Sequence, residues 1–216
     1  MKKGGLLLFL AGGLVFFLFV FFSYLVHKNL FTQLDFDTTV RLQNQIPRRF
    51  DSFFSIFSLV GSFEAMSLFL LVVLGIITLV RGKLVGFVQA IIAFLGFIGF
   101  HFIELYGKTF VNHLPPPEFM VRTQKFVEFP QFHIRQEFSY PSGHAGRAAF
   151  VSALLLLFTA KAKKLSQTQK VFIYSIIGIY DIIMFTSRIY LGEHWLTDVV
   201  GGIFLGGGLG IITAAF

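Results

Sequence analysis

The sequence contains no cysteine and few charged residues, and both shortages narrow what the chain can be. Without cysteine it forms no disulfide, and it offers neither a thiol nucleophile nor a thiolate metal ligand. Only 13% of its 216 residues are charged, whereas 55% are hydrophobic and 31 are Phe. A soluble domain carries charge on about a quarter of its residues, and a chain of this length cannot bury so much apolar surface in its own core. We therefore expect an integral membrane protein.

Several segments are long and apolar enough to cross a bilayer as helices, which takes about 20 mostly apolar residues each. They are residues 5–27, 54–80, 84–106, 145–160, 171–187 and 195–216. We predict an all-α bundle of six transmembrane helices that forms a single domain over residues 1–216. The apolar run of the first segment is longer than that of a signal peptide, and no small-residue cleavage site follows it, so we expect it to remain as the first span.

Basic residues in the short connections predict how the bundle is oriented. An even number of spans places both termini on one side, and the charged residues of the connections on that side are all basic: Lys2, Lys3, Arg81, Lys83, Lys161, Lys163, Lys164 and Lys170. Short connections rich in Lys and Arg stay in the cytoplasm, so we expect both termini there and the long connections near 28–53 and 107–144 outside a cell membrane. Since the basic residues set topology, the net charge of +7 predicts no nucleic-acid partner.

Polar residues at the start of the fourth span predict a site for an anion on the outer face. Ser142 precedes an apolar helix and can cap it, while Gly143 lets a ligand approach the backbone closely. The free N–H groups and the dipole of a helix N-terminus favour negative charge. His144 would lie beside the anion, although a histidine here could also be a polar residue at the membrane interface.

A second group of polar residues follows the fifth span. His194 and Asp198 are four apart and share a helix face if the sixth span begins by then. The carboxylate could accept from one imidazole nitrogen and leave the other as a base or nucleophile, or the pair could satisfy two interfacial polar groups. Arg188 adds a planar donor suited to phosphate. Lys108 adds a point charge with Glu104 one turn earlier as a partner, or it is a lysine that snorkels. These residues favour phosphoryl transfer. Metal-dependent hydrolysis fits less well, because the same residues do not make a convincing set of metal ligands.

At these residues the sequence resembles the type 2 phosphatidic acid phosphatase superfamily, whose pattern is Lys-x6-Arg-Pro, Pro-Ser-Gly-His and Ser-Arg-x5-His-x3-Asp. The second motif is complete at residues 141–144. The third is complete at Ser187, Arg188, His194 and Asp198. The first departs from the pattern, because Lys108 and Pro116 are present but Pro115 stands in the place of Arg. His113, Arg122 or Arg135 could replace that cation, and nothing in the sequence chooses among them.

The resemblance implies a lipid phosphatase that needs no metal or other cofactor and forms a phosphohistidine. It implies His194 as the nucleophile, Asp198 as the residue that orients it, and His144 as the acid that protonates the leaving oxygen. The phosphoryl oxygens would be bound by Lys108, Arg188, Ser142 and the backbone at Gly143.

The position of the site at the interface suggests a substrate with a phosphate head and a tail in the bilayer. Aromatic residues flank it as an interfacial belt or, alternatively, as a pocket: Phe119, Phe126, Phe129, Phe132, Phe138 and Tyr140. The chain looks like the B-type phosphatidylglycerophosphatases of bacteria, so we expect phosphatidylglycerophosphate as the substrate, with undecaprenyl pyrophosphate and phosphatidic acid as alternatives. Because the Arg of the first motif is missing, the alternative to an enzyme is a membrane protein that binds or translocates phospholipid without catalysis. No feature predicts the oligomeric state.

Other residues within the predicted spans suggest packing roles. Glu64 and Asp181 are each expected to form a buried ion pair or a hydrogen bond between helices, and a proton or substrate pathway is the alternative. Gly202, Gly206 and Gly210 recur every four residues in the last span, which predicts a small-residue face that packs closely on another helix.

Overall fold

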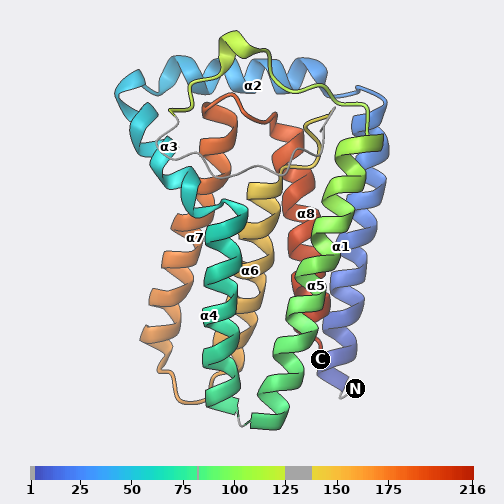
Figure 1. The fold of residues 1–216 in the computed structure, drawn as a ribbon, viewed down its shortest axis with the longest axis vertical. Helices are drawn as coiled ribbons and strands as arrows, with labels where there is room; N and C mark the ends of the chain where they lie inside the picture. The colour runs from blue at the N-terminus through green and yellow to red at the C-terminus, as the bar shows by residue number, and fades with distance from the viewer. Residues whose placement is uncertain (1–2, 82, 125–137) are drawn as a thin grey trace.

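The protein is a bundle of long helices with a shorter helix across one end (Figure 1). The structure is a computed structural model and describes residues 3–81, 83–124 and 138–216, in which all regular elements are helical. Five of the helices in these ranges are long and apolar enough to span a membrane, and a bent pair makes a sixth span. The predicted all-α membrane bundle is therefore confirmed. The two chain ends lie at the same end of the bundle, as an even number of spans requires, and Lys2 lies outside the described residues.

The long helices follow the predicted spans, with some shifts of their ends. They are α1 (Lys3–His27), α4 (Phe63–Arg81), α5 (Lys83–Phe110), α6 (Gly143–Lys161), α7 (Gln167–Tyr190) and α8 (Leu196–Thr213). The predicted second span, 54–80, is wrong as a single helix, because α3 (Asp51–Val60) and α4 meet at a bend of 50°. The bend leaves the carbonyl of Gly61 outside the regular helical ladder, where it accepts a hydrogen bond from Arg147 Nε of α6 at 3.1 Å. The break is thereby attached to the centre of the bundle.

The predicted outer connection over 28–53 is largely helical. Helix α2 (Thr32–Gln45) lies across the end of the bundle in Figure 1, and a short 3-10 helix, Arg48–Phe50, follows it. Its sequence is mostly polar, and the residues it buries are Asp35 and Thr39. A buried carboxylate needs hydrogen-bond or ionic partners, so α2 must contact polar groups elsewhere in the protein.

Helices α6 and α8 pack closely enough to fix the start of one against the start of the other. A side chain at Gly206 would collide with the carbonyl of Gly146, and one at Gly202 would come within 2.5 Å of the carbonyl oxygen of Ser142. The predicted small-residue packing face is confirmed. At the end of this seam the N–H of Ser142 donates to the carbonyl of Asp198 at 2.9 Å. The two helix N-termini therefore share a rigid junction.

The two acidic residues within the predicted spans have different surroundings. Asp181 on α7 accepts a hydrogen bond from Ser152 on α6 at 2.8 Å, so the expected contact between helices is present. Glu64 is exposed in the first turn of α4, and the expectation that it is buried is wrong. The bend before α4 explains the difference, because it turns residue 64 from a mid-span position into a helix N-terminal position, where negative charge is favoured.

Candidate active site

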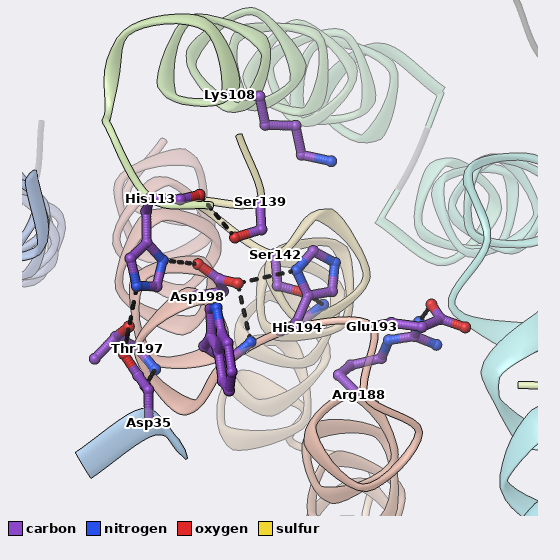
Figure 2. A network of polar contacts seen from close by, with 12 residues as sticks. Asp35, Lys108, His113, Ser139, Ser142, Arg188, Glu193, His194, Thr197 and Asp198 are labelled. Atoms are coloured by element: carbon purple, nitrogen blue, oxygen red, sulfur yellow. Dashed lines mark hydrogen bonds and ion pairs between the residues drawn. The ribbon is translucent and has the colours of Figure 1, made fainter. Parts of the chain in front are cut away.

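The three motif regions meet at the end of the bundle that α2 crosses. They are the last turns of α5, the first turn of α6 and the connection between α7 and α8 (Figure 1). In Figure 2, Lys108 points toward His194, and the pair of Arg188 and Glu193 lies on the same side of Asp198. His113 and Asp35 lie on the other side of Asp198. The structure thus brings together residues that are far apart in the sequence: Asp35 and Asp198 are separated by 163 positions.

The start of α6 provides a helix N-terminus at the bottom of the site. Ser142 is fully buried and caps the helix, with its hydroxyl accepting from the N–H of Ala145 at 3.5 Å. A Cβ at Gly143 would overlap the carboxylate of Glu104, so any other residue there would displace that carboxylate. The expected close approach at Gly143 is therefore made by a side chain of α5. The first amides of α6 have no acceptor in a preceding turn of the helix, and the positive end of its dipole lies next to Asp198, whose carbonyl accepts from the N–H of Ser142 at 2.9 Å.

His194 and Asp198 are in contact, although not in the way the spacing suggests. Helix α8 begins at Leu196 with Trp195 as its N-cap, so His194 precedes the helix and the two residues do not share a helix face. The carboxylate of Asp198 instead contacts the two residues that precede the helix. Oδ2 accepts from the N–H of Trp195 at 3.0 Å and lies 3.4 Å from His194 Nδ1. Burial lowers the pKa of His194, against the opposing effect of the bond to Asp198. A neutral ring that donates from Nδ1 keeps its lone pair on Nε2.

Two of the expected cations lie beside this histidine. Arg188 is fully buried, donates to the hydroxyl of Ser58 and forms an ion pair with Glu193. Within the described part of the chain its Nε has no hydrogen-bond partner, which leaves a buried charged donor for a ligand. Lys108 Nζ lies 3.3 Å from Glu104 Oε1, so the expected pair on α5 is present.

The turn between α7 and α8 sets the position of His194 relative to Arg188. The N–H groups of Glu193 and His194 both donate to the carbonyl of Arg188 at 3.2 Å. Gly192 has a φ of +69°, a left-handed conformation that favours glycine. A Cβ at that position would also collide with the carbonyl of Met120, so the turn depends on glycine for two reasons.

Sequence reasoning missed a third cation, Arg147. It is buried on α6, with Nη1 3.4 Å from Glu104 Oε2 and Nη2 3.5 Å from Nδ1 of His144. A signal was available, because an arginine one turn inside an apolar span is costly unless it has a function or a partner. Its three-residue spacing from His144 also places both on neighbouring positions of the helix surface.

The candidates for the missing Arg do not occupy equivalent positions. Pro115 is exposed and lines a pocket of about 400 Å³ together with His113. Arg122 lies over the ring of Tyr190, with its guanidinium carbon 5.3 Å from the ring centre. Arg135 lies outside the described residues. Among the described arginines, Arg147 is the additional one that borders the N-terminal end of α6, near Gly143 and His144.

His113 bridges the buried carboxylates of Asp198 and Asp35. Its Nδ1 lies 2.8 Å from Asp198 Oδ1, and its Nε2 lies 3.4 Å from Asp35 Oδ2. Burial by itself lowers the pKa of His113, but the hydrogen bonds to Asp198 and Asp35 outweigh it and raise the pKa to about 9. Sequence reasoning missed Asp35, because nothing marked the long outer connection as a helix with a buried face. Within the described residues, no three or more His, Asp or Glu side chains form a group that could hold a metal ion.

The flanking aromatic residues do not form one set. Tyr140 is fully buried in the bundle, where its ring stacks on Phe19 at 6.1 Å between centres and its hydroxyl bonds to Ser23. Burial raises its pKa. Its assignment to an interfacial belt or a pocket is wrong, because it anchors the segment before α6 to α1. Phe119 is exposed, and Phe138 is half-buried. Phe126, Phe129 and Phe132 lie outside the described residues.

The chain is similar to known proteins in sequence and in fold. The chain is 41% identical over 69 residues to phosphatidylglycerophosphatase B of Bacillus subtilis (strain 168), which is 32% of this chain and about a third (34%) of that protein. Its fold is similar to the crystal structure of a transmembrane PAP2 type phosphatidylglycerolphosphate phosphatase from Bacillus subtilis, with a TM-score of 0.74, 21% identity and coverage of 94% of this chain and 93% of that one. The structure of Aquifex aeolicus LpxE gives a TM-score of 0.59 at 21% identity, covering 85% of this chain and 96% of that one.

The family assignment rests on the longest match. The family model described as the PAP2 superfamily matches residues 83–216, which is more than half of the chain and includes all three motif regions. The chain therefore belongs to the PAP2 superfamily.

Proposed function

We propose that this protein is a lipid phosphatase that removes phosphate from the head of a membrane lipid, with phosphatidylglycerophosphate as its principal substrate. The observation that carries the proposal is a buried His194, held by Asp198, whose remaining nitrogen faces a cluster of cations and a helix N-terminus. A site that only bound phosphate would need the cations, but it would not need an oriented nucleophile.

The geometry supports a reaction in two steps. In the first, Nε2 of His194 attacks phosphorus, a nitrogen–phosphorus bond forms and the bond to the leaving oxygen breaks. Arg147 donates toward Nδ1 of His144, so the proton of that ring is on Nε2 and can pass to the leaving oxygen. In the second, water attacks the phosphohistidine, releases phosphate and returns a proton to His144.

The charge that develops on the phosphoryl oxygens would be stabilised by groups already in place. Arg188 offers its unpartnered Nε and Lys108 approaches from another direction, while the helix that Ser142 caps begins nearby. Donors that are fixed before the reaction cost no reorganisation during it. We assign the same groups to binding and to catalysis for this reason.

Apolar clefts on both sides of α4 suit the tail of a lipid. One of about 600 Å³ lies between α4, α6 and α7, and one of about 380 Å³ lies between α4 and α5. The smaller cleft is lined by His101, which bonds to Glu104 at 3.1 Å, and Glu104 in turn pairs with Lys108. A lipid with a chain in this cleft would have its head close to the cations.

The preference for phosphatidylglycerophosphate is supported by the similarity to phosphatidylglycerophosphatase B. Undecaprenyl pyrophosphate and phosphatidic acid carry the same reactive group and are the alternatives. Phosphate release from the three lipids by detergent-purified protein in excess EDTA tests the proposal, beside His194→Ala and beside His27→Gln as a control at an exposed histidine. We expect release that survives EDTA, is lost in His194→Ala and is unchanged in His27→Gln. Lipid binding or transport without release, or full activity of His194→Ala, would contradict it.

We also propose that the site faces the outside and both termini the cytoplasm. The absence of native cysteine allows a direct test with single cysteines and a membrane-impermeant maleimide. Phe119→Cys, next to the site, should react in intact cells, and Lys163→Cys, in the short connection at the other end, should react only after permeabilisation. The opposite pattern would invert the orientation.

A further inference from the structure

Four buried side chains form a continuous row that runs from α2 to the proposed nucleophile. Asp35 contacts His113, His113 contacts Asp198, and Asp198 contacts His194, at 3.4, 2.8 and 3.4 Å in that order. All four have less than a tenth of their surface exposed. Figure 2 shows that His113 and Asp35 lie on the side of Asp198 opposite His194 and Arg188, away from the groups that we assign to phosphate binding.

The row has a charge pattern that its geometry dictates. Carboxylates accept hydrogen bonds, so a ring that bonds one through each nitrogen donates from both and is an imidazolium. Among the residues that the structure describes, the ionisable groups that face His113 are Asp35 from α2 and Asp198 from α8, with His194 beyond Asp198. From α1, His27 accepts a hydrogen bond from the N–H of Asn112, the residue before His113. One buried cation is therefore shared by two buried carboxylates.

We propose that His113 is a positioning residue that offsets the charge of Asp198 and thereby keeps His194 neutral and nucleophilic. The proposal rests on the proposed function for its catalytic meaning. An unopposed carboxylate beside a histidine favours the protonated ring, typically raising its pKa by about 1–3. A protonated His194 has no lone pair with which to attack phosphorus. With His113 charged, Asp198 can orient His194 without holding a second proton on it.

Asp35 supplies the other half of this arrangement. It accepts from the N–H of Thr197 at 2.9 Å and from its hydroxyl at 2.7 Å, in addition to its contact with His113. Thr197 directly precedes Asp198, so α2 holds both the cation and the first turn of α8. This explains why α2 buries a carboxylate, which would otherwise destabilise the fold.

The test compares His113→Gln with wild type, with His27→Gln as the matched control. The control removes an exposed histidine that bonds to the neighbouring residue Asn112. Two readouts are measured between about pH 5 and 9: kcat/KM, and the histidine titrations by NMR of protein labelled in its imidazole rings. We expect His113→Gln to move the acid limb of kcat/KM, and the pKa of His194, upward by about one pH unit. The control should change neither.

Further variants separate charge from packing. His113→Lys restores a cation and should return the acid limb toward that of wild type. Asp35→Asn removes one of the two carboxylates that hold the proton on His113, so the acid limb should move upward as in His113→Gln, but by less. A purely structural role for His113 would lower activity equally at all pH values and give no rescue by lysine.

The outcomes also separate this inference from the proposed function. An unshifted pKa of His194 in folded His113→Gln would overturn the inference while leaving the phosphatase intact. If His113→Gln does not fold, the wild-type titration decides, because a His113 that loses its proton near the ordinary histidine pKa overturns the inference. If the NMR shift occurs but no lipid phosphate is hydrolysed, the charge relation stands and the phosphatase proposal fails.

Discussion

Asp198→Asn is the substitution that tests the site most severely, because the carboxylate has three donors for its two oxygens. Oδ1 lies 2.8 Å from His113 Nδ1, and Oδ2 accepts from the N–H of Trp195 at 3.0 Å and lies 3.4 Å from His194 Nδ1. An amide has one oxygen and one NH2 group. In either orientation at least one donor therefore faces a donor.

The size of the effect follows from which contact is lost. An amide that places its NH2 toward His194 donates to Nδ1, which moves the ring proton to Nε2 and removes the attacking lone pair. In a hydrolase with an analogous oriented histidine, such a tautomer change lowers kcat by about 10⁴. A buried donor left without an acceptor also destabilises the fold by about 1–3 kcal/mol. We expect kcat/KM to fall about a thousandfold to ten-thousandfold, with a lower melting temperature.

The assay is phosphate release from phosphatidylglycerophosphate by purified protein in detergent with EDTA, with His27→Gln prepared in parallel. Circular dichroism and a thermal melt establish that the variant is folded before its rate is interpreted. A folded Asp198→Asn protein that retains more than about a tenth of the wild-type kcat/KM would refute the assignment of Asp198 as the residue that orients His194.

Three further predictions follow from the same geometry. Arg188→Lys keeps a charge but loses the planar donors, so steady-state kinetics should show kcat/KM reduced about a hundredfold, and a reduction below about threefold would contradict it. Gly143→Ala should lower the melting temperature by several degrees and abolish activity, because its Cβ meets the carboxylate of Glu104, whereas a wild-type melt would show that the space exists. The pKa of His113 is raised from 6.5 to about 9, so its contribution to stability is complete below pH 6.5 and is lost as the pH rises through 9. The wild-type melting temperature should therefore fall across this range, and His113→Gln should flatten the fall.

Much of the bundle could be predicted because membrane spans obey a strong rule. Backbone polar groups in a bilayer must be paired within the span, so length and hydropathy locate helices well. The bend between α3 and α4 escaped this rule, because the sequence stays apolar through Gly61 and Ser62 while the carbonyl of Gly61 finds its partner on α6. That partner, Arg147, is distant in sequence, so the sequence alone does not indicate its contact with Gly61.

The motif residues were predictable for a different reason, since their order and spacing match a known pattern. The structure brings Lys108 and Arg188 to the same side of Asp198 as His194. The pattern gave no indication of Asp35, because a single carboxylate in a polar outer segment is usually solvated. Its burial becomes visible only when α2 is placed across the end of the bundle and next to Thr197.

The most direct test of the central claim is to trap the covalent intermediate. Purified wild-type protein is mixed with phosphatidylglycerophosphate carrying a labelled terminal phosphate, quenched rapidly in alkali and digested, and the labelled peptide is identified by mass spectrometry. We predict an acid-labile, alkali-stable phosphoryl group on His194 that is absent from His194→Ala. Turnover of the lipid with no labelled histidine, or with the label on another residue, would contradict the proposed mechanism.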